Sequence, residues 1–290
     1  MQTANTLDML RKTLGELRAN NTSIGLVPTM GALHEGHLTL VREAQETCDH
    51  VVASIFVNPT QFGPNEDLDA YPRQLAEDSA LLEAEGVALL WAPTVDAMYP
   101  EGFETNVSVS RISENFCGAS RPGHFDGVAT VVCKLFNQVM PDKAFFGEKD
   151  YQQLAVIRAM ARDLDLTRPH AADIIGVPTV READGLAMSS RNRYLSPMHR
   201  AAAAALPNAM QLTIAQIEAG ESPSLALGML ERMLKESGFE QVDYAQLADA
   251  QSLQKLESPP TRPARLLVAA RIGGTRLIDN MAVGPGTEVE

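Results

Sequence analysis

One stretch of the sequence, residues 24–41, constrains the fold more than any other. Residues 24–27 form a short apolar run of the length and composition of a buried strand. Pro28 and Gly31 interrupt this run, and from Gly36 onward apolar residues recur with helical spacing. We therefore predict that a strand enters a tight turn here and that a helix leaves the turn directly.

Two histidines, His34 and His37, stand at the expected start of that helix. The first N–H groups of a helix have no partner within it, and the helix dipole makes this end positive, so anions bind there. Imidazoles at this point can donate hydrogen bonds to phosphate oxygens, and Gly36 lets a bulky ligand approach the backbone. The alternative is a capping turn whose histidines only satisfy nearby carbonyls. The position at a strand-to-helix turn favours nucleotide binding.

Strand and helix patterns alternate as far as residue 176. Strands are expected at residues 24–27, 51–57, 87–91, 144–146 and 172–176. Helices are expected from residue 36 onward and at residues 4–19, 75–85, 128–139 and 154–164. Asp126 is expected as the N-cap of the helix at 128–139, and residues 106–110 as a short extended piece. This alternation indicates right-handed crossovers and a parallel sheet. We predict an α/β fold whose Rossmann-like N-terminal domain, residues 1–176, contains about five parallel strands.

Two further loops follow strands of this series, at the strand ends where ligands bind in open α/β sheets. Residues 147–150 carry Lys149 into a second strand-to-helix turn, which repeats the anion-site geometry of the first. Lys149 could also be a solvated surface charge, and Asp150 could be only an N-cap. Gln61 lies in the loop of residues 58–64, where its amide could read a ligand or only close the loop with a hydrogen bond.

The character of the chain changes after residue 176. Residues 177–195 are polar, basic towards their end and without helical or strand period, which is typical of a functional lid. Ser189, Ser190 and Arg191 suit phosphate, although the serines could equally start a helix. Two helices are expected within residues 197–237. Strands follow at 242–247, 266–272 and 275–279, with a Gly273-Gly274 hairpin turn between the last two. We therefore predict a smaller α+β C-terminal lid domain, residues 177–290, with an antiparallel sheet.

Composition excludes several classes of protein. The net charge of −13 argues against a broad nucleic-acid interface, which needs a basic face. No apolar run approaches the roughly 18 residues of a membrane span, and the N-terminus lacks the pattern of a signal peptide. Cys48, Cys117 and Cys133 are widely spaced and fit free thiols in a reducing compartment. We expect a cytoplasmic protein that binds small molecules rather than nucleic acid or membrane.

Four sequence blocks together resemble the pantothenate synthetase family, a branch of the nucleotidyltransferase superfamily that includes class I aminoacyl-tRNA synthetases. They are Pro-Thr-Met-Gly-Ala-Leu-His-Glu-Gly-His at 28–37, Phe-Val-Asn-Pro-Thr-Gln-Phe at 56–62, Phe-Gly-Glu-Lys-Asp-Tyr-Gln-Gln at 146–153 and Asp-Gly-Leu-Ala-Met-Ser-Ser-Arg-Asn at 184–192. The resemblance covers roughly residues 24–200 in the family's order, and the C-terminal third fits in length and pattern. Thr60 stands where the family has methionine, but the neighbouring Gln61 is retained.

The resemblance implies an ATP-dependent ligase in pantothenate and coenzyme A biosynthesis. ATP and (R)-pantoate would give pantoyl adenylate and pyrophosphate, and β-alanine would then displace AMP to give pantothenate. The implied ATP-binding residues are Met30, Gly31, Ala32, Leu33, His34, Glu35, Gly36, His37, Gly147, Glu148, Lys149, Asp150, Val180, Met188, Ser189, Ser190 and Arg191. Gln61 and Gln153 would hold pantoate, with Gln61 also near β-alanine. The catalytic residues would be His34, His37, Lys149 and Arg191, with His37 as proton donor.

The resemblance also implies Mg²⁺ with ATP and a homodimer. No protein ligand of Mg²⁺ is identified, although the carboxylates of Glu77 and Asp78 are candidates. The alternatives are another adenylyl- or cytidylyltransferase of the same superfamily, or a nucleotide-binding module without catalysis. The sequence has neither a P-loop nor a Gly-x-Gly-x-x-Gly after its first strand, so a P-loop kinase and a dinucleotide dehydrogenase are disfavoured.

Overall fold

The computed structural model describes residues 1–64 and 66–284, which divide into two units. The first unit comprises Met1–Ser113, Arg121–Glu148 and Gln153–Pro178. The second comprises Glu114–Ser120, Lys149–Gln152 and the described chain from Thr179 onward. The first unit thus ends two residues beyond the expected boundary at 176, but two short earlier segments belong to the second unit.

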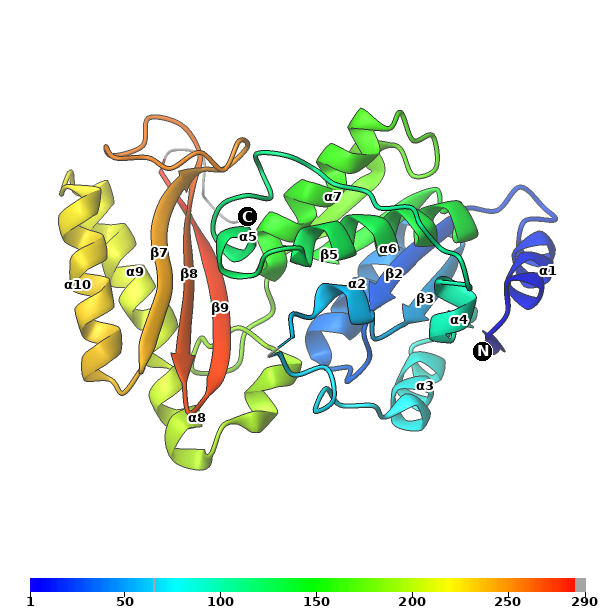
Figure 1. Cartoon of the computed structure of the whole chain (residues 1–290), viewed down its shortest axis with the longest axis horizontal. Helices are drawn as coiled ribbons and strands as arrows, with labels where there is room; N and C mark the ends of the chain where they lie inside the picture. Colours follow the sequence, from blue (N-terminus) through cyan, green and yellow to red (C-terminus); the bar gives the residue numbers. More distant parts are fainter. Residues whose placement is uncertain (65, 285–290) are drawn as a thin grey trace. The chain divides into compact units, whose positions relative to one another are not determined.

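The first unit contains a six-stranded parallel sheet, and the predicted α/β class is confirmed (Figure 1). In spatial order the strands are β1 (Gln2–Ala4), β4 (Leu89–Trp91), β3 (His50–Ile55), β2 (Ile24–Thr29), β5 (Lys143–Gly147) and β6 (Ile174–Val177). Strand β1 is absent from the sequence prediction because three residues are too few to show a period. It pairs with β4 at the edge of the sheet, Thr3 opposite Leu90.

Helices pack against this sheet through apolar faces. The main helices are α1 (Leu7–Leu17), α2 (Glu35–Thr47), α3 (Leu75–Ala84), α6 (His124–Val139) and α7 (Tyr151–Asp163), and the short ones are η1 (Pro59–Gln61), α4 (Val95–Met98), η2 (Glu148–Asp150) and η3 (Ala171–Asp173). Val41 of α2 and Leu82 of α3 share a buried cluster with Val27 and Leu90 of the strands. Helix α6 contacts both α1 and β2.

The prediction of the Asp126 cap is wrong, and the expected extended piece at residues 106–110 is not paired as a strand. Helix α6 begins at His124 after Gly123, whose φ of 81° suits glycine, and Asp126 lies inside the first turn. The Asp126 carboxylate instead accepts a hydrogen bond of 2.7 Å from Ser108 Oγ. The segment at residues 106–110 is instead attached to α6, since Thr130 Oγ1 accepts from the backbone N–H of residue 107 at 2.9 Å.

The order of the strands places a switch point in the sheet. From β2 the chain continues to β3 and β4 on one side, and then returns to add β5 and β6 on the other side of β2. The carboxyl ends of β2 and β5, where this direction reverses, are where open α/β sheets bind ligands. Residues 30–37 follow β2 directly and residues 147–150 lie at the end of β5, so both predicted anion-binding turns belong to these two strands.

The second unit contains a three-stranded antiparallel sheet, β7 (Gln241–Asp249), β8 (Ala264–Ile272) and β9 (Thr275–Val283), in that spatial order. Helices α9 (Ala205–Glu218) and α10 (Pro223–Glu236) pack beside one another, and Leu230, Leu266 and Val268 lie in the shared core (Figure 1). A third helix, α8 (Pro197–Ala203), precedes them where the sequence predicted two in all, and the short helix α5 (Cys117–Ser120) also belongs to this unit. The hairpin turn is confirmed, since Gly273 and Gly274 have φ angles of 56° and 74°.

Residues 177–195 are not an irregular loop. Arg181 and Ala187 form an isolated antiparallel bridge, and η4 (Ser190–Tyr194) follows with the Ser189 hydroxyl as its N-cap. The alternative that these serines start a helix is therefore confirmed. The expected function of this segment as a lid stays a prediction.

Three further properties concern the described part of the chain as a whole. Within residues 1–64 and 66–284, no helix combines the length and the apolar character needed to cross a bilayer. The three cysteines are free thiols. No group of three or more histidine, cysteine and acidic side chains there is arranged to hold a metal ion.

Gly127 allows α6 to contact the short helix η1 at backbone distance. A Cβ at this position would overlap the carbonyl oxygen of Thr60 and would lie 2.9 Å from the amide nitrogen of Gln61. Backbone atoms cannot move aside as a flexible side chain can, so any larger residue must push the two elements apart.

We therefore predict that Gly127→Ala lowers the free energy of unfolding by about 1–3 kcal/mol, because overpacking outweighs the gain in helix propensity of about 1 kcal/mol. Denaturant unfolding measures the difference. Gly228→Ala is the matched control, since Gly228 also lies within a helix but has nothing within 4 Å of the added Cβ. The control should be neutral or more stable, and equal destabilisation of both variants would contradict the steric explanation.

Candidate active site

The turn from β2 into α2 has an unusual backbone that a buried carboxylate supports. Gly31 and Ala32 have φ angles of 82° and 53°, and the second is costly for a residue with a Cβ. Asp78 of α3, only 1% exposed, accepts hydrogen bonds from the N–H groups of Ala32 at 2.8 Å and Leu33 at 2.9 Å. Both oxygens of Asp78 thus hold the turn, so this carboxylate has a structural role whether or not it also contacts Mg²⁺.

His34 and His37 together cap helix α2. His34 Nδ1 accepts from the N–H of Gly36 at 3.2 Å, and His37 Nδ1 accepts from the N–H of His34 at 3.3 Å. The two rings lie with their centroids 4.1 Å apart. Because each Nδ1 is an acceptor, a neutral ring must carry its proton on Nε2.

This geometry confirms the capping part of the alternative interpretation of the histidines. In the two capping bonds the rings accept from backbone N–H groups. The capping bonds use Nδ1 and leave each Nε2–H as the donor of its ring. Capping and donation to an anion are therefore compatible functions of the same two residues.

Gln61 lies in η1, after β3, and is 8% exposed. Its Oε1 accepts a hydrogen bond of 2.9 Å from Asn58 Nδ2, so the alternative of a loop-closing bond is confirmed. Asn58 is itself fixed, because Nδ2 also donates to Gly127 O at 3.1 Å and Oδ1 accepts from Tyr99 Oη at 2.8 Å. Since Oε1 faces Asn58, the Nε2 group of Gln61 is presented as a donor. Asn58 is a site residue that the sequence reasoning missed.

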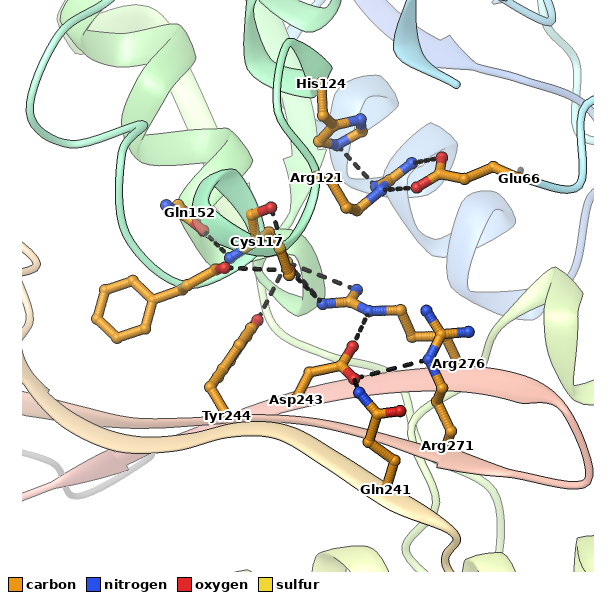
Figure 2. Close-up of polar contacts among 12 residues, drawn as sticks. Glu66, Cys117, Arg121, His124, Gln152, Gln241, Asp243, Tyr244, Arg271 and Arg276 are labelled. Atoms are coloured by element: carbon orange, nitrogen blue, oxygen red, sulfur yellow. Dashed lines mark hydrogen bonds and ion pairs between the residues drawn. The ribbon is translucent and has the colours of Figure 1, made fainter. Parts of the chain in front are cut away.

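The main chain of Gln61 is held by a second cluster, Glu66, Arg121 and His124 (Figure 2). Arg121 makes two bonds of 2.6 Å to Glu66 and a bond of 3.2 Å to Gln61 O. His124 Nδ1 also donates to Gln61 O at 2.8 Å. The guanidinium can only donate, so His124 Nε2, 3.0 Å from Arg121 Nη1, accepts and the proton lies on Nδ1.

The second unit holds seven further predicted site residues, from Lys149 to Arg191. Lys149 Nζ lies 3.6 Å from an Asp150 carboxylate oxygen, and the Lys149 side chain is 19% exposed, so it is not a fully solvated surface charge. Met188 N–H donates to Val180 O at 3.0 Å, which brings these two residues together across the bridged segment. Ser189 Oγ accepts from the N–H of Arg191 at 3.3 Å.

The predicted residues are therefore distributed over both units. The first unit places Met30–His37 and Gln61 at the carboxyl ends of the neighbouring strands β2 and β3, Gly147 and Glu148 at the end of β5, and Gln153 in the first turn of α7. The second unit contains Lys149, Asp150, Val180, Met188, Ser189, Ser190 and Arg191. Asn58, Arg121, His124 and Gly127 are additional residues of the first unit that support Gln61.

The ion pair of Glu66 with Arg121 predicts a pH dependence of stability. Burial alone would raise the pKa of the Glu66 carboxyl, but the hydrogen bonds and charge of Arg121 lower it from 4.5 to about 2. A lowered pKa stabilises the fold above pH 4.5, and this stabilisation is lost as the pH falls from 4.5 towards 2. Because the Glu66 side chain is 26% exposed, solvent screening reduces its contribution to about 2 kcal/mol.

We expect Glu66→Gln to lower the free energy of unfolding by about 2 kcal/mol at pH 7 and by progressively less below pH 4.5. Denaturant unfolding of parent and variant across this pH range measures the difference. Glu46→Gln, at an exposed position of α2, is the control and should show a small, constant difference. A Glu66→Gln difference that is the same at pH 7 and pH 3 would contradict the prediction.

Residues 2–282 of the chain match the family described as pantoate-beta-alanine ligase. The chain is 68% identical over 285 residues to the pantothenate synthetase of Novosphingobium aromaticivorans, covering 98% of this chain and all of that protein. It is 58% identical to the pantothenate synthetase of Sphingopyxis alaskensis, with 98% and 100% coverage.

Solved structures agree with these relatives. Pantothenate synthetase from Thermus thermophilus superposes with a TM-score of 0.91 at 48% identity, covering 98% of this chain and all of that one. Pantoate-beta-alanine ligase from Francisella tularensis, complexed with beta-gamma ATP and beta-alanine, gives a TM-score of 0.81 at 33% identity, covering 99% and 100%. The sequence blocks, the parallel sheet with its two strand-to-helix turns and the full-length matches agree, and the chain belongs to the pantoate–β-alanine ligase family.

Proposed function

We propose that the chain condenses (R)-pantoate with β-alanine at the expense of ATP, through a pantoyl adenylate, with the predicted residues in the roles described below. The observation that carries the assignment of roles is the pair of capped histidines after β2, whose Nδ1 hydrogen bonds set both Nε2–H groups as donors. They stand at the start of a helix and beside the switch point of the sheet, where anionic ligands are favoured.

In the first step a pantoate carboxylate oxygen attacks the α-phosphorus of ATP. The bond between the α-phosphorus and the bridging oxygen to the β-phosphorus breaks, and pyrophosphate leaves with that electron pair. Negative charge grows on the phosphate oxygens during this step, and fixed donors aimed at them lower the barrier. We assign this donation to the Nε2–H groups of His34 and His37, with His37 also supplying a proton.

Gln61 and Gln153 are assigned to pantoate, and Gln61 also to β-alanine. Asn58 fixes the Gln61 amide with its Nε2 group as donor, which suits the carboxylate and hydroxyl oxygens of pantoate. A neutral amide can bind the attacking carboxylate without the strong ion pairing that would weaken it as a nucleophile. In the second step the free amine of β-alanine attacks the acyl carbonyl, and AMP leaves.

The remaining ATP contacts are assigned to Gly147, Glu148 and the second unit, with residues 177–290 acting as a lid domain. Lys149 and Arg191 are cations suited to the triphosphate and the departing pyrophosphate, and Asp150 is suited to ribose hydroxyls. Val180 and Met188 are joined by their backbone hydrogen bond, so they would contact the nucleotide as one element.

We also propose that Mg²⁺ accompanies ATP, that the chain forms a homodimer and that it acts in the cytoplasm. The Mg²⁺ proposal rests on the chemistry of ATP, whose phosphates usually supply several of the ligands of this ion and need few from protein. Both oxygens of Asp78 accept bonds from the turn, so the proposal assigns no ligand to this side chain.

Two substitutions of His37 separate its capping role from donation. In His37→Asn the amide oxygen can replace Nδ1 as acceptor, but nothing replaces Nε2–H, so we predict that adenylate formation falls about 10²–10³-fold while stability changes little. In His37→Gln the amide nitrogen reaches the Nε2 position, so part of the rate should return although the cap is weakened. Pantoate-dependent exchange of pyrophosphate into ATP measures the rate, and an Asn variant with the parent rate would refute the assignment.

An isotope experiment tests the proposed intermediate. With ¹⁸O in the pantoate carboxylate, attack at the α-phosphorus transfers one label to AMP and none to pyrophosphate. We expect this result because both predicted turns supply donors, whereas the sequence has no P-loop to hold a γ-phosphate for transfer. Mass spectrometry of the products gives the distribution. Label in inorganic phosphate, with ADP as the other product, would establish an acyl phosphate instead.

A further inference from the structure

Two neighbouring polar residues of β9, Asp279 and Asn280, are each 3% exposed although the proposed mechanism gives them no role. A buried polar side chain in a sheet must find partners or destabilise the fold. Besides Arg265 of the neighbouring strand β8, their partners belong to two segments that are far apart in the sequence, residues 149–152 and residues 180–188. Both segments are in the same unit as β9.

Asn280 holds the backbone of Lys149. Its Nδ2 donates to Lys149 O at 2.9 Å, and its Oδ1 accepts from Arg265 Nη1 at 2.7 Å. A guanidinium only donates, so Arg265 sets the orientation of the amide and leaves Nδ2 facing the Lys149 carbonyl. Arg265 also lies over the ring of Tyr151, 4.1 Å from its centroid, and Tyr151 Oη donates to Ala250 O at 2.9 Å. The turn that carries Lys149 is thus attached to the antiparallel sheet at two points, at Lys149 through Asn280 and at Tyr151 through Arg265.

Asp279 holds the bridged segment at residues 180–188. Its carboxylate, with a fully buried side chain, accepts from Arg181 Nη1 at 2.7 Å and Nη2 at 3.0 Å, a two-point ion pair. Arg181 Nη1 also donates to Gly185 O at 3.0 Å, so the same guanidinium closes the segment internally. The bond between Met188 and Val180 completes this short hairpin.

We propose that Asp279 and Asn280 are positioning residues for adenylate formation, which fix the Lys149 turn and the Val180–Met188 hairpin on one strand. The proposal rests on the ATP-binding roles assigned above to these two segments. Adjacent residues of a strand share one rigid backbone, so the two segments are held in a single arrangement before ATP binds. Such preorganisation matters because misplacement of a contacting group by about 1 Å can cost a hundredfold in rate.

Asn280→Asp is the sharpest variant, because it keeps the size and the acceptor for Arg265 but has no N–H for Lys149 O. We expect kcat/KM for ATP in pantoate-dependent pyrophosphate exchange to fall about tenfold, as one positioning hydrogen bond is lost, while KM for pantoate stays within about twofold of the parent. Arg265→Met is the second variant. It removes the group that orients the amide but leaves Nδ2, so a smaller loss of the same kind is expected.

Asp279→Asn should also lower kcat/KM for ATP, and it should raise the rate of hydrogen exchange at the backbone amides of residues 180–188. Arg276→Gln is the matched control on β9, since it loses bonds to Asp243 at 2.7 Å and Ser120 at 3.1 Å but touches neither segment. The control variant should have a lower midpoint of thermal unfolding but no selective decrease in kcat/KM for ATP. Three results would each overturn the proposal. Asn280→Asp could keep the parent kcat/KM for ATP, or it could change the kinetic constants for ATP and pantoate equally. Arg276→Gln could lower kcat/KM for ATP as much as Asn280→Asp does.

Lys149→Ala separates this inference from the proposed function. If that variant keeps the parent exchange rate, the role assigned to Lys149 is wrong. If it loses exchange while Asn280→Asp does not, only the positioning role fails. A double-mutant cycle on ATP affinity, measured by calorimetry, adds a direct check: Asn280→Asp should weaken ATP binding in the parent but not in a Lys149→Ala background.

Discussion

The turn between β2 and α2 depends on one buried carboxylate, that of Asp78. Its two bonds to the N–H groups of Ala32 and Leu33 satisfy two buried donors and support the positive φ of Ala32. The position of His34 at the start of α2 follows from this turn, and the position of His37 follows from His34. A single side chain of α3 thus fixes where the two candidate donors stand. It contributes to the site without facing any substrate.

The sequence predicts those parts of the fold in which local pattern and long-range packing agree. The run at residues 24–27 and the histidine turn are clear because a buried strand and a helix start each have a strong local signal. Strand β1 and the place of Asp126 were not predictable in the same way. The first is too short for any period, and the second depends on Ser108, which is distant in sequence. Local rules favoured an Asp cap where a tertiary hydrogen bond decided otherwise.

The same limit applies to the site. Motif residues such as Gln61 could be named from the sequence, but the residues that hold it could not. Asn58 lies in the same loop and could have been suspected, since an amide three residues away can bond to another amide. Arg121 and Gly127 come from a segment some sixty residues later, and nothing in their local pattern indicates contact with η1. The sequence thus identifies groups that could touch ligands, and the structure identifies the groups that orient them.

Orientation is the common element of these supports, because the imidazole and amide groups of the site can each be arranged in two ways. An imidazole can carry its proton on either nitrogen, and an amide can present either its oxygen or its nitrogen. For four of these side chains a neighbour that can only donate settles the choice: backbone N–H groups for His34 and His37, and guanidinium groups for His124 and Asn280. A site made of groups fixed in this way needs little reorganisation when charge develops on a bound phosphate, and low reorganisation is the main source of electrostatic catalysis. The fold therefore contributes to the chemistry chiefly by removing the alternatives that these side chains would have in water.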